Sequence, residues 1–209
     1  MDNYWILLLG LFVQVLFSAR MFVQWILSEK AKKVVSPVIY WQLSLFASFL
    51  FMFYGWLRMD FAIILGQIFS YYIYIWNLNI LNQWGKIYIV IRVLFLITPA
   101  IVISLFAISN SGDISRLWTD ITFGLLLFGS IGQTIFAFRF IYQWWYSRKI
   151  SRSILPNGFW IISIIGSISI LIYGIIRKDP ILILSHCVNF IIYTRNVFIN
   201  NRKTQKNNK

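Results

Sequence analysis

Long apolar runs, each of about 20 residues, follow one another along the chain and are separated by short polar or charged segments. A run of this length is what an α-helix needs to cross a bilayer, whereas a soluble helix is apolar on one side only. We therefore expect an all-α integral membrane protein. The runs predict seven transmembrane helices, at about 4–28, 37–57, 61–81, 87–108, 120–147, 157–176 and 180–200.

The sequence repeats itself. A shift of 119 residues places residues 10–77 on residues 129–196 without a gap. Apolar composition alone would align leucines and isoleucines, but here Arg, Gln, Trp, Pro and Asp coincide in one register. The coinciding pairs include Gln14/Gln133, Phe17/Phe136, Arg20/Arg139, Gln24/Gln143, Trp25/Trp144, Ser28/Ser147, Pro37/Pro156, Trp41/Trp160, Ser44/Ser163, Tyr54/Tyr173, Asp60/Asp179, Tyr74/Tyr193 and Asn77/Asn196.

Each copy holds three predicted helices, and one further helix separates the copies. Because three is odd, the extra helix restores the direction of the chain, so the two triple-helix repeats are parallel. The predicted layout is thus 3+1+3. Its parts are a first repeat at 1–82, a linker helix with its connecting loop at 83–119, a second repeat at 120–200 and a basic tail at 201–209.

Composition and charge support this interpretation. The chain is 59% hydrophobic, its mean hydropathy is +0.73, and only 12% of its residues are charged. The net charge of +13 could indicate a nucleic-acid partner, but the Lys and Arg residues gather at helix ends, as in membrane proteins. Loops on one side and the tail carry Lys30, Lys32, Lys33, Lys86, Arg148, Lys149, Arg152, Arg202, Lys203, Lys206 and Lys209 against the single acid Glu29. We expect a cytoplasmic C-terminus, a periplasmic N-terminus and no nucleic-acid partner.

Arginines inside the predicted spans are the first candidates for function. Arg92 and Arg195 lie near cytoplasmic helix ends, where a long side chain can reach the interface. Arg20 and Arg139 lie about two turns deeper, where an arginine costs about 2.5–3.5 kcal/mol on insertion scales. All six carboxylates fall in predicted loops or termini. An anionic ligand is therefore expected at Arg20 and Arg139, since guanidinium binds phosphate bidentately. Backbone carbonyls at a broken helix are the alternative partners.

Polar residues accompany both arginines at helical spacing and form a stripe on four of the predicted helices. They are either ligands of a polar head group or hydrogen-bonding contacts between helices. His186 stands where the first copy has Gln67, so we expect a hydrogen-bonding substitute rather than a proton relay. With the two arginines, the candidate binding residues are Gln14, Gln24, Trp25, Tyr74, Asn77, Gln133, Gln143, Trp144, His186, Tyr193 and Asn196.

Other repeated residues have structural interpretations. Pro37 and Pro156 open the second helix of each copy, where proline is well tolerated, although a gating hinge is an alternative. Asp60 and Asp179 are spaced to cap the third helix of each copy. We find no metal-ligand cluster, nucleophile–base pair, carboxylate pair or phosphate-binding glycine loop. The chain is therefore not expected to be an enzyme or to carry a metal or cofactor.

A family resemblance rests on these motifs. Residues 132–196 contain "GQTIFAFRFIYQWW", then "LPNGFW", then "YGIIRKDP" and "YTRN", and residues 14–46 contain a diverged copy, "QVLFSARMFVQW". They resemble the lipid A biosynthesis N-terminal domain, which in some proteins is fused to a lipid A disaccharide synthase. The first copy departs from the family pattern at Phe61 and Trp76. The three-plus-one-plus-three layout also resembles PQ-loop and SWEET-like (MtN3-like) transporters, which implies alternating access.

These observations lead to one main hypothesis and two alternatives. The main one is a carrier or flippase in the bacterial inner membrane for an anionic lipid-linked substrate, a polyprenyl-phosphate sugar or a lipid A-type phosphoglycolipid. The first alternative is a SWEET-like transporter of a small soluble sugar or metabolite. The second is a non-catalytic membrane partner of a glycolipid glycosyltransferase.

Overall fold

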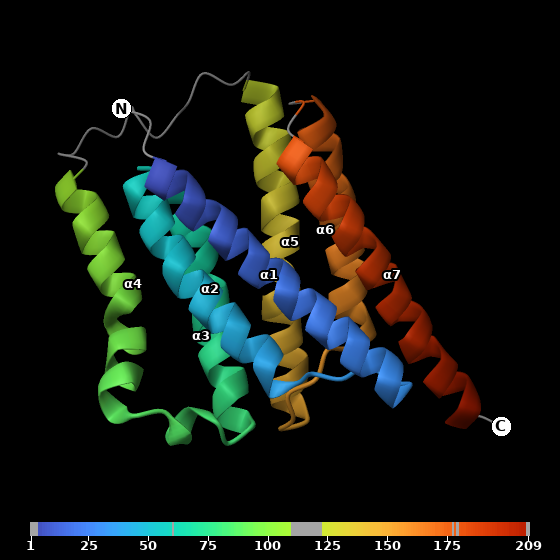
Figure 1. Cartoon of the computed structure of the whole chain (residues 1–209). Helices are drawn as coiled ribbons and strands as arrows, with labels where there is room; N and C mark the ends of the chain where they lie inside the picture. Colours follow the sequence, from blue (N-terminus) through green and yellow to red (C-terminus); the bar gives the residue numbers. More distant parts are fainter. Residues whose placement is uncertain (1–3, 60, 110–122, 177, 179, 208–209) are drawn as a thin grey trace. The chain divides into compact units, whose positions relative to one another are not determined.

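The described part of the protein is helical. The structure, a computed structural model, describes residues 4–59, 61–109, 123–176, 178 and 180–207. Within these ranges the chain forms seven α-helices and a short 3-10 helix, and no strand (Figure 1). The elements are α1 (Tyr4–Ala31), α2 (Val38–Leu57), α3 (Phe61–Ile80), η1 (Trp84–Lys86), α4 (Ile89–Ser109), α5 (Phe123–Lys149), α6 (Asn157–Ile176) and α7 (Pro180–Asn207).

The seven helices lie where the apolar runs predict them, to within a few residues at most ends. The largest difference is in α7, which continues to Asn207 and so includes most of the predicted tail. By length and composition, α1, α2, α4 and α6 are able to cross a membrane. The chain is thus an all-α membrane protein, while crossing by α3, α5 and α7, the parallel repeats and the orientation of the termini stay predictions.

The helices fall into two compact units that cut across the predicted repeats. The first unit comprises residues 1–20 and 41–120, and the second comprises residues 21–40 and 121–209. Helix α1 contributes to both, because its last third and the loop after it belong with α5, α6 and α7. The second unit therefore contains side chains from both sequence copies.

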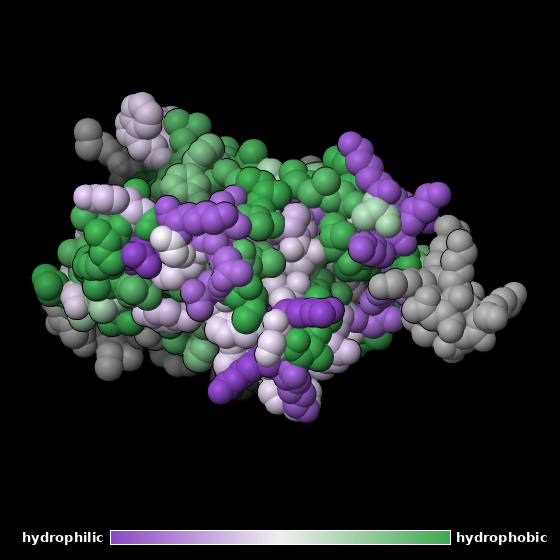
Figure 2. Space-filling view, turned by 90° about the horizontal axis from the view of Figure 1, so that it is seen from below, coloured by the Kyte–Doolittle hydropathy of each residue, from purple (hydrophilic) through white to green (hydrophobic). Residues whose placement is uncertain are grey.

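Polar side chains are buried inside the units, while large apolar ones cover much of the outside. Helix α4 exposes a long series of Ile, Leu and Val side chains. Figure 2 shows the molecule from below, and on the face seen there hydrophilic side chains project among apolar ones. An apolar exterior around polar contacts is the arrangement that a lipid environment favours. The buried polar residues include Arg20, Gln24, Ser28, Ser44, Ser48, Asn77, Arg139, Gln143, Ser147, Ser163, Ser167 and Asn196.

The sequence repeat extends to the backbone. Lys32 after α1 and Ser151 after α5 both take a left-handed conformation, with φ near 50°. In each copy the amide of the following residue bonds back to a serine carbonyl, at 3.3 Å for Ser28 and 3.2 Å for Ser147. This is the hydrogen bond of a Schellman C-cap. Each loop thus begins with the same turn.

The prolines also occupy equivalent places. Pro37 and Pro156 immediately precede α2 and α6, and their carbonyls accept hydrogen bonds from Tyr40 (3.1 Å) and Phe159 (3.0 Å). This matches the predicted helix-opening role. The predicted caps Asp60 and Asp179 lie outside the described residues.

Close packing of α5 against α6 yields a test of the fold. A Cβ added at the buried Gly166 would lie 2.9 Å from the Phe136 Cα, whereas one at Gly66 in α3 would meet nothing within 4 Å. We expect Gly166→Ala to destabilise the protein by about 1–3 kcal/mol, since backbone must shift. Gly66→Ala should cause no loss, because alanine favours helix. Unfolding in detergent measures both, and equal stability of the two variants would contradict the packing.

Candidate functional site

Arg20 joins three helices of the first unit. It lies on α1 with only 5% of its surface exposed. Its Nη1 donates to the Ser44 hydroxyl of α2 at 2.8 Å and to the Tyr74 hydroxyl of α3 at 3.3 Å. Its guanidinium carbon lies 4.6 Å from the centre of the Phe17 ring. Two hydroxyl oxygens and an aromatic ring therefore contact this cation.

Arg139 has a related environment in the second unit. It lies on α5, is 4% exposed, and its Nη1 donates to the Tyr193 hydroxyl of α7 at 3.2 Å. The guanidinium carbon lies 3.3 Å from the centre of the Phe136 ring. Among the described residues, its Nε has no hydrogen-bond acceptor and no carboxylate forms an ion pair with it. A buried charge is thus left with an unused donor.

The two environments share their aromatic partners and differ at a serine. Tyr74 and Tyr193 are equivalent in the repeat, as are Phe17 and Phe136. The cation–π contacts offset part of the cost of burying each guanidinium. However, Ser163, the equivalent of Ser44, donates to the Phe159 carbonyl at 2.6 Å. Arg139 consequently lacks the serine acceptor that Arg20 has.

The glutamines of the repeated motif hold the loops. In the second copy the Gln143 side-chain amide donates to Ser147 Oγ and to the Ile154 carbonyl, both at 2.9 Å. The Ile154 amide donates in return to Ser147 Oγ at 3.2 Å. All of these atoms belong to the end of α5 and the loop after it. Gln143 and Ser147 therefore clamp the loop onto α5, the helix that precedes it.

The first copy repeats this loop clamp. Gln24 donates to Ser28 Oγ at 2.9 Å and to the Val35 carbonyl at 3.3 Å, and the Val35 amide donates to Ser28 Oγ at 3.1 Å. Ser36 and Ser153, one from each loop, lie within 3.0 Å through their hydroxyl oxygens. The clamped loops therefore contact each other within the second unit.

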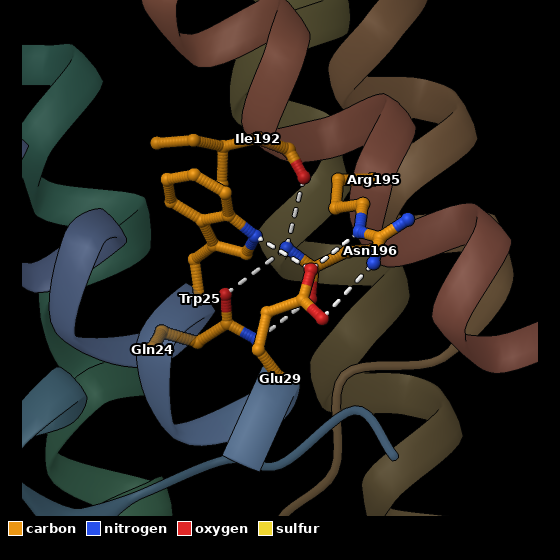
Figure 3. A network of polar contacts seen from close by, with 6 residues as sticks. All are labelled: Gln24, Trp25, Glu29, Ile192, Arg195 and Asn196. Carbon is orange, nitrogen blue, oxygen red and sulfur yellow. Dashed lines mark hydrogen bonds and ion pairs between the residues drawn. The ribbon is translucent and has the colours of Figure 1, made fainter. Parts of the chain in front are cut away.

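An amide pair connects α1 to α7 (Figure 3). Gln24 Nε2 donates to Asn196 Oδ1 at 3.0 Å, and Asn196 Nδ2 donates to Gln24 Oε1 at 3.2 Å. Asn196 Nδ2 also donates to the Ile192 carbonyl at 2.9 Å. Both side chains are fully buried. Gln24 and Asn196, both predicted as ligands, therefore satisfy each other's hydrogen bonds. This agrees with the second interpretation of the polar residues, in which they form hydrogen-bonding contacts between helices.

A charged pair lies next to the amides. Arg195 Nε and Nη2 donate to the two carboxylate oxygens of Glu29, the second at 3.1 Å (Figure 3). The Trp25 indole also donates to Glu29, at 3.2 Å. The Arg195 side chain is 39% exposed, and its extension to the membrane interface stays a prediction. Glu29, assigned to a loop, lies in the last turn of α1 and within reach of α7.

The remaining predicted ligands are dispersed. Asn77 is buried in the first unit and donates to the Ile73 carbonyl at 2.9 Å. Gln14 is exposed on α1. Trp144 is half-buried, with the Arg148 guanidinium 5.3 Å from its ring. The side chain of Gln133 lies outside the described residues.

His186 occupies the hydrogen-bonding place of Gln67. Ser48 of α2 donates to Gln67 Oε1 at 2.9 Å, and the equivalent Ser167 of α6 lies 3.1 Å from His186 Nδ1. Each copy therefore connects its second and third helices through one serine and one polar partner. In the part of the chain that the structure describes, no group of three His, Cys, Asp or Glu side chains is placed to hold a metal ion.

Sequence reasoning missed two partners of the arginines, Ser44 for Arg20 and Glu29 for Arg195. The repeat marked Ser44, but nothing distinguished it as an acceptor for Arg20. Glu29 is not repeated, since Arg148 occupies the equivalent position. Its partner Arg195 is replaced as well, by Trp76. Neither Glu29 nor Arg195 is kept at the equivalent position of the other copy, and this shared absence was the available signal that they form a pair.

The fold and these contacts define a class: a helical membrane protein with a duplicated buried arginine. The chain belongs to the lipid A biosynthesis N-terminal domain family, whose model matches in two tandem copies, at residues 9–79 and 128–198. The predicted resemblance to this family is thereby confirmed. The likeness to PQ-loop and SWEET-like transporters stays a prediction, and no solved structure matches the chain.

Relatives include lipid-A-disaccharide synthases of Chlamydia. The Chlamydia muridarum protein is 31% identical over 194 residues, which cover 87% of this chain and 32% of that protein. The Chlamydia pneumoniae protein is 27% identical over 184 residues, which cover 85% of this chain and 30% of that protein. The chain thus spans about a third of the length of these curated relatives.

The amide pair gives a second testable prediction. Asn196→Ala removes a fully buried partner of Gln24 and should lower the free energy of unfolding by about 1–3 kcal/mol, because a buried amide loses its hydrogen bonds. Asn189→Ala, a half-buried asparagine of the same helix, is the matched control and should change stability less. Unfolding by SDS titration in detergent micelles measures both. A control that is as destabilising as Asn196→Ala would argue against the pair.

Proposed function

We propose that the protein carries an anionic lipid-linked substrate across the bacterial inner membrane by alternating access. The substrate is a lipid A-type phosphoglycolipid or a polyprenyl-phosphate sugar. Family membership supports the link to lipid A chemistry. The observation that carries the proposal is Arg139, a buried cation whose Nε has no acceptor among the described residues and which no described carboxylate neutralises.

The chemistry of the arginine sites favours a phosphate. Guanidinium donates through a planar fork that matches phosphate oxygens, and charge-assisted bonds of this kind are about twice as strong as neutral ones. Tyr193 and Tyr74 add hydroxyls beside Arg139 and Arg20. In this proposal each arginine binds phosphate within its own unit, and the acyl or prenyl chains stay in lipid. The exposed apolar side chains of the helices support that placement.

The proposed topology is multi-pass, with the C-terminus in the cytoplasm and the N-terminus in the periplasm. It rests on the bias of positive charge. Lys30, Lys32, Lys33, Arg148 and Arg152 are all exposed near the clamped loops. The protein is proposed to work without catalysis of its own.

Transport by arginine variants tests the proposal. Arg139→Ala should lower flipping of a fluorescent lipid A-type phosphoglycolipid in proteoliposomes by at least about tenfold, because one charged hydrogen bond to phosphate is worth about 1.5–3 kcal/mol. Arg20→Ala should reduce it similarly. Arg152→Ala, at an exposed arginine in the loop after α5, is the control and should retain transport.

Folding is monitored by the elution volume and melting temperature of each variant in detergent. Full transport by the folded Arg20→Ala/Arg139→Ala double variant would refute the proposed role of the arginines. Absence of flipping by the wild-type protein would refute the carrier itself.

A second candidate function is a non-catalytic partner of a membrane glycosyltransferase. It is favoured by the relatives, which are named lipid-A-disaccharide synthases and are about three times as long as the matched segment. In this alternative the chain would present a lipid substrate to a separate enzyme. Reconstitution separates the two functions: the purified protein flips lipid alone if it is a carrier, and does not if it only assists a synthase.

A further inference from the structure

A second unused donor lies close to Arg139. The indole Nε1 of Trp160, on α6, is buried and has no hydrogen-bond acceptor among the described residues. The Trp160 side chain is fully buried, and Arg139 is 4% exposed. The second unit thus has two buried N–H groups, one neutral and one charged, without an acceptor.

Both side chains border the same two aromatic rings. The Arg139 guanidinium carbon lies 5.8 Å from the Phe159 ring centre and 5.9 Å from the Tyr193 ring centre. The Trp160 ring lies 4.9 Å from Phe159 and 6.0 Å from Tyr193, measured between ring centres. The two side chains therefore share one neighbourhood, between α5, α6 and α7.

The serine of this neighbourhood supplies no acceptor to the arginine. Ser163 Oγ is turned to the Phe159 carbonyl at 2.6 Å, whereas the equivalent Ser44 accepts from Arg20 at 2.8 Å. The one acceptor that the described residues offer Arg139 is the Tyr193 hydroxyl. The two copies differ in this respect despite their common sequence motif.

The chemistry of the two donors limits which group can accept their hydrogen bonds. Arginine and the tryptophan indole donate hydrogen bonds and have no acceptor atom, so their complement must be an acceptor. A buried donor without a partner costs about 1–3 kcal/mol, and more when it is charged. The group that relieves both donors best carries negative charge on several oxygens. A phosphate meets this requirement.

We propose that Arg139 and Trp160 form a phosphate-binding subsite in the second sequence copy. The subsite rests on the proposed function, since it names the part of the protein that holds the anionic head group. Trp160 is a specificity-determining donor that selects phosphorylated over dephosphorylated lipid.

Binding of matched ligands to the full-length protein in detergent tests this subsite. Native mass spectrometry would compare a lipid A-type phosphoglycolipid, its dephosphorylated counterpart and inorganic phosphate. Trp160→Phe keeps an aromatic ring beside Tyr193 and removes the N–H. It should weaken binding of the phosphorylated lipid about tenfold, the scale of one charged hydrogen bond, and leave the dephosphorylated lipid unchanged.

Two further variants support the comparison. Trp41→Phe makes the same change at the equivalent tryptophan and should alter binding of the phosphorylated lipid less than about twofold. Arg139→Lys keeps the charge, removes Nε and should give the same selective loss as Trp160→Phe. It also provides the test if Trp160→Phe does not fold. If Trp160→Phe and Arg139→Lys weaken binding of inorganic phosphate as much as binding of the phosphorylated lipid, the subsite recognises phosphate without its lipid.

The outcomes separate the subsite from the proposed function. A wild-type protein that prefers the phosphorylated lipid, with Trp160→Phe unchanged, would refute the subsite alone. Equal loss of both lipids in Trp160→Phe would assign Trp160 to packing and also refute the subsite. A wild-type protein that does not distinguish the two lipids would refute the proposed substrate as well.

Discussion

A charge inside a helical bundle with an apolar exterior has to be stabilised by the protein or by what the protein binds. Water is scarce there, and moving a cation into an apolar medium is costly without a partner. The two repeated arginines meet this constraint with hydroxyls and aromatic rings. For Arg139 these groups compensate the charge only in part. Arg139 retains an unused donor, and this incomplete compensation is the basis of the proposed anion site.

The motif Arg-x-x-x-Gln-Trp-x-x-Ser serves two purposes within a short stretch of helix. The arginine reaches into the interior of its unit, while the glutamine and serine clamp the loop that follows. One turn of helix separates these roles. The clamp needs an amide that donates twice and a hydroxyl that accepts, which explains why glutamine and serine occur together in both copies. The substrate need not touch Gln24 or Gln143 for the motif to be repeated.

Much of the fold is readable from the sequence, because bilayer-length apolar runs and a gapless repeat are strong signals. They located the seven helices and singled out Arg20 and Arg139, both of which are buried. The pairing of Glu29 with Arg195 was not predictable in this way, because it joins residues 166 positions apart. Gln14 lies six residues before Arg20, about 120° away around the helix, and it is exposed. A polar stripe thus gives helix faces but not the partners of each side chain.

The central claim is that Arg139 binds an anion. An experimental structure of the protein in lipid, purified with a lipid A-type phosphoglycolipid, tests it most directly. We expect a phosphate oxygen within hydrogen-bonding distance of Arg139 Nε. An ordered water or a protein acceptor in that place, with the lipid phosphate bound elsewhere or not at all, would contradict it.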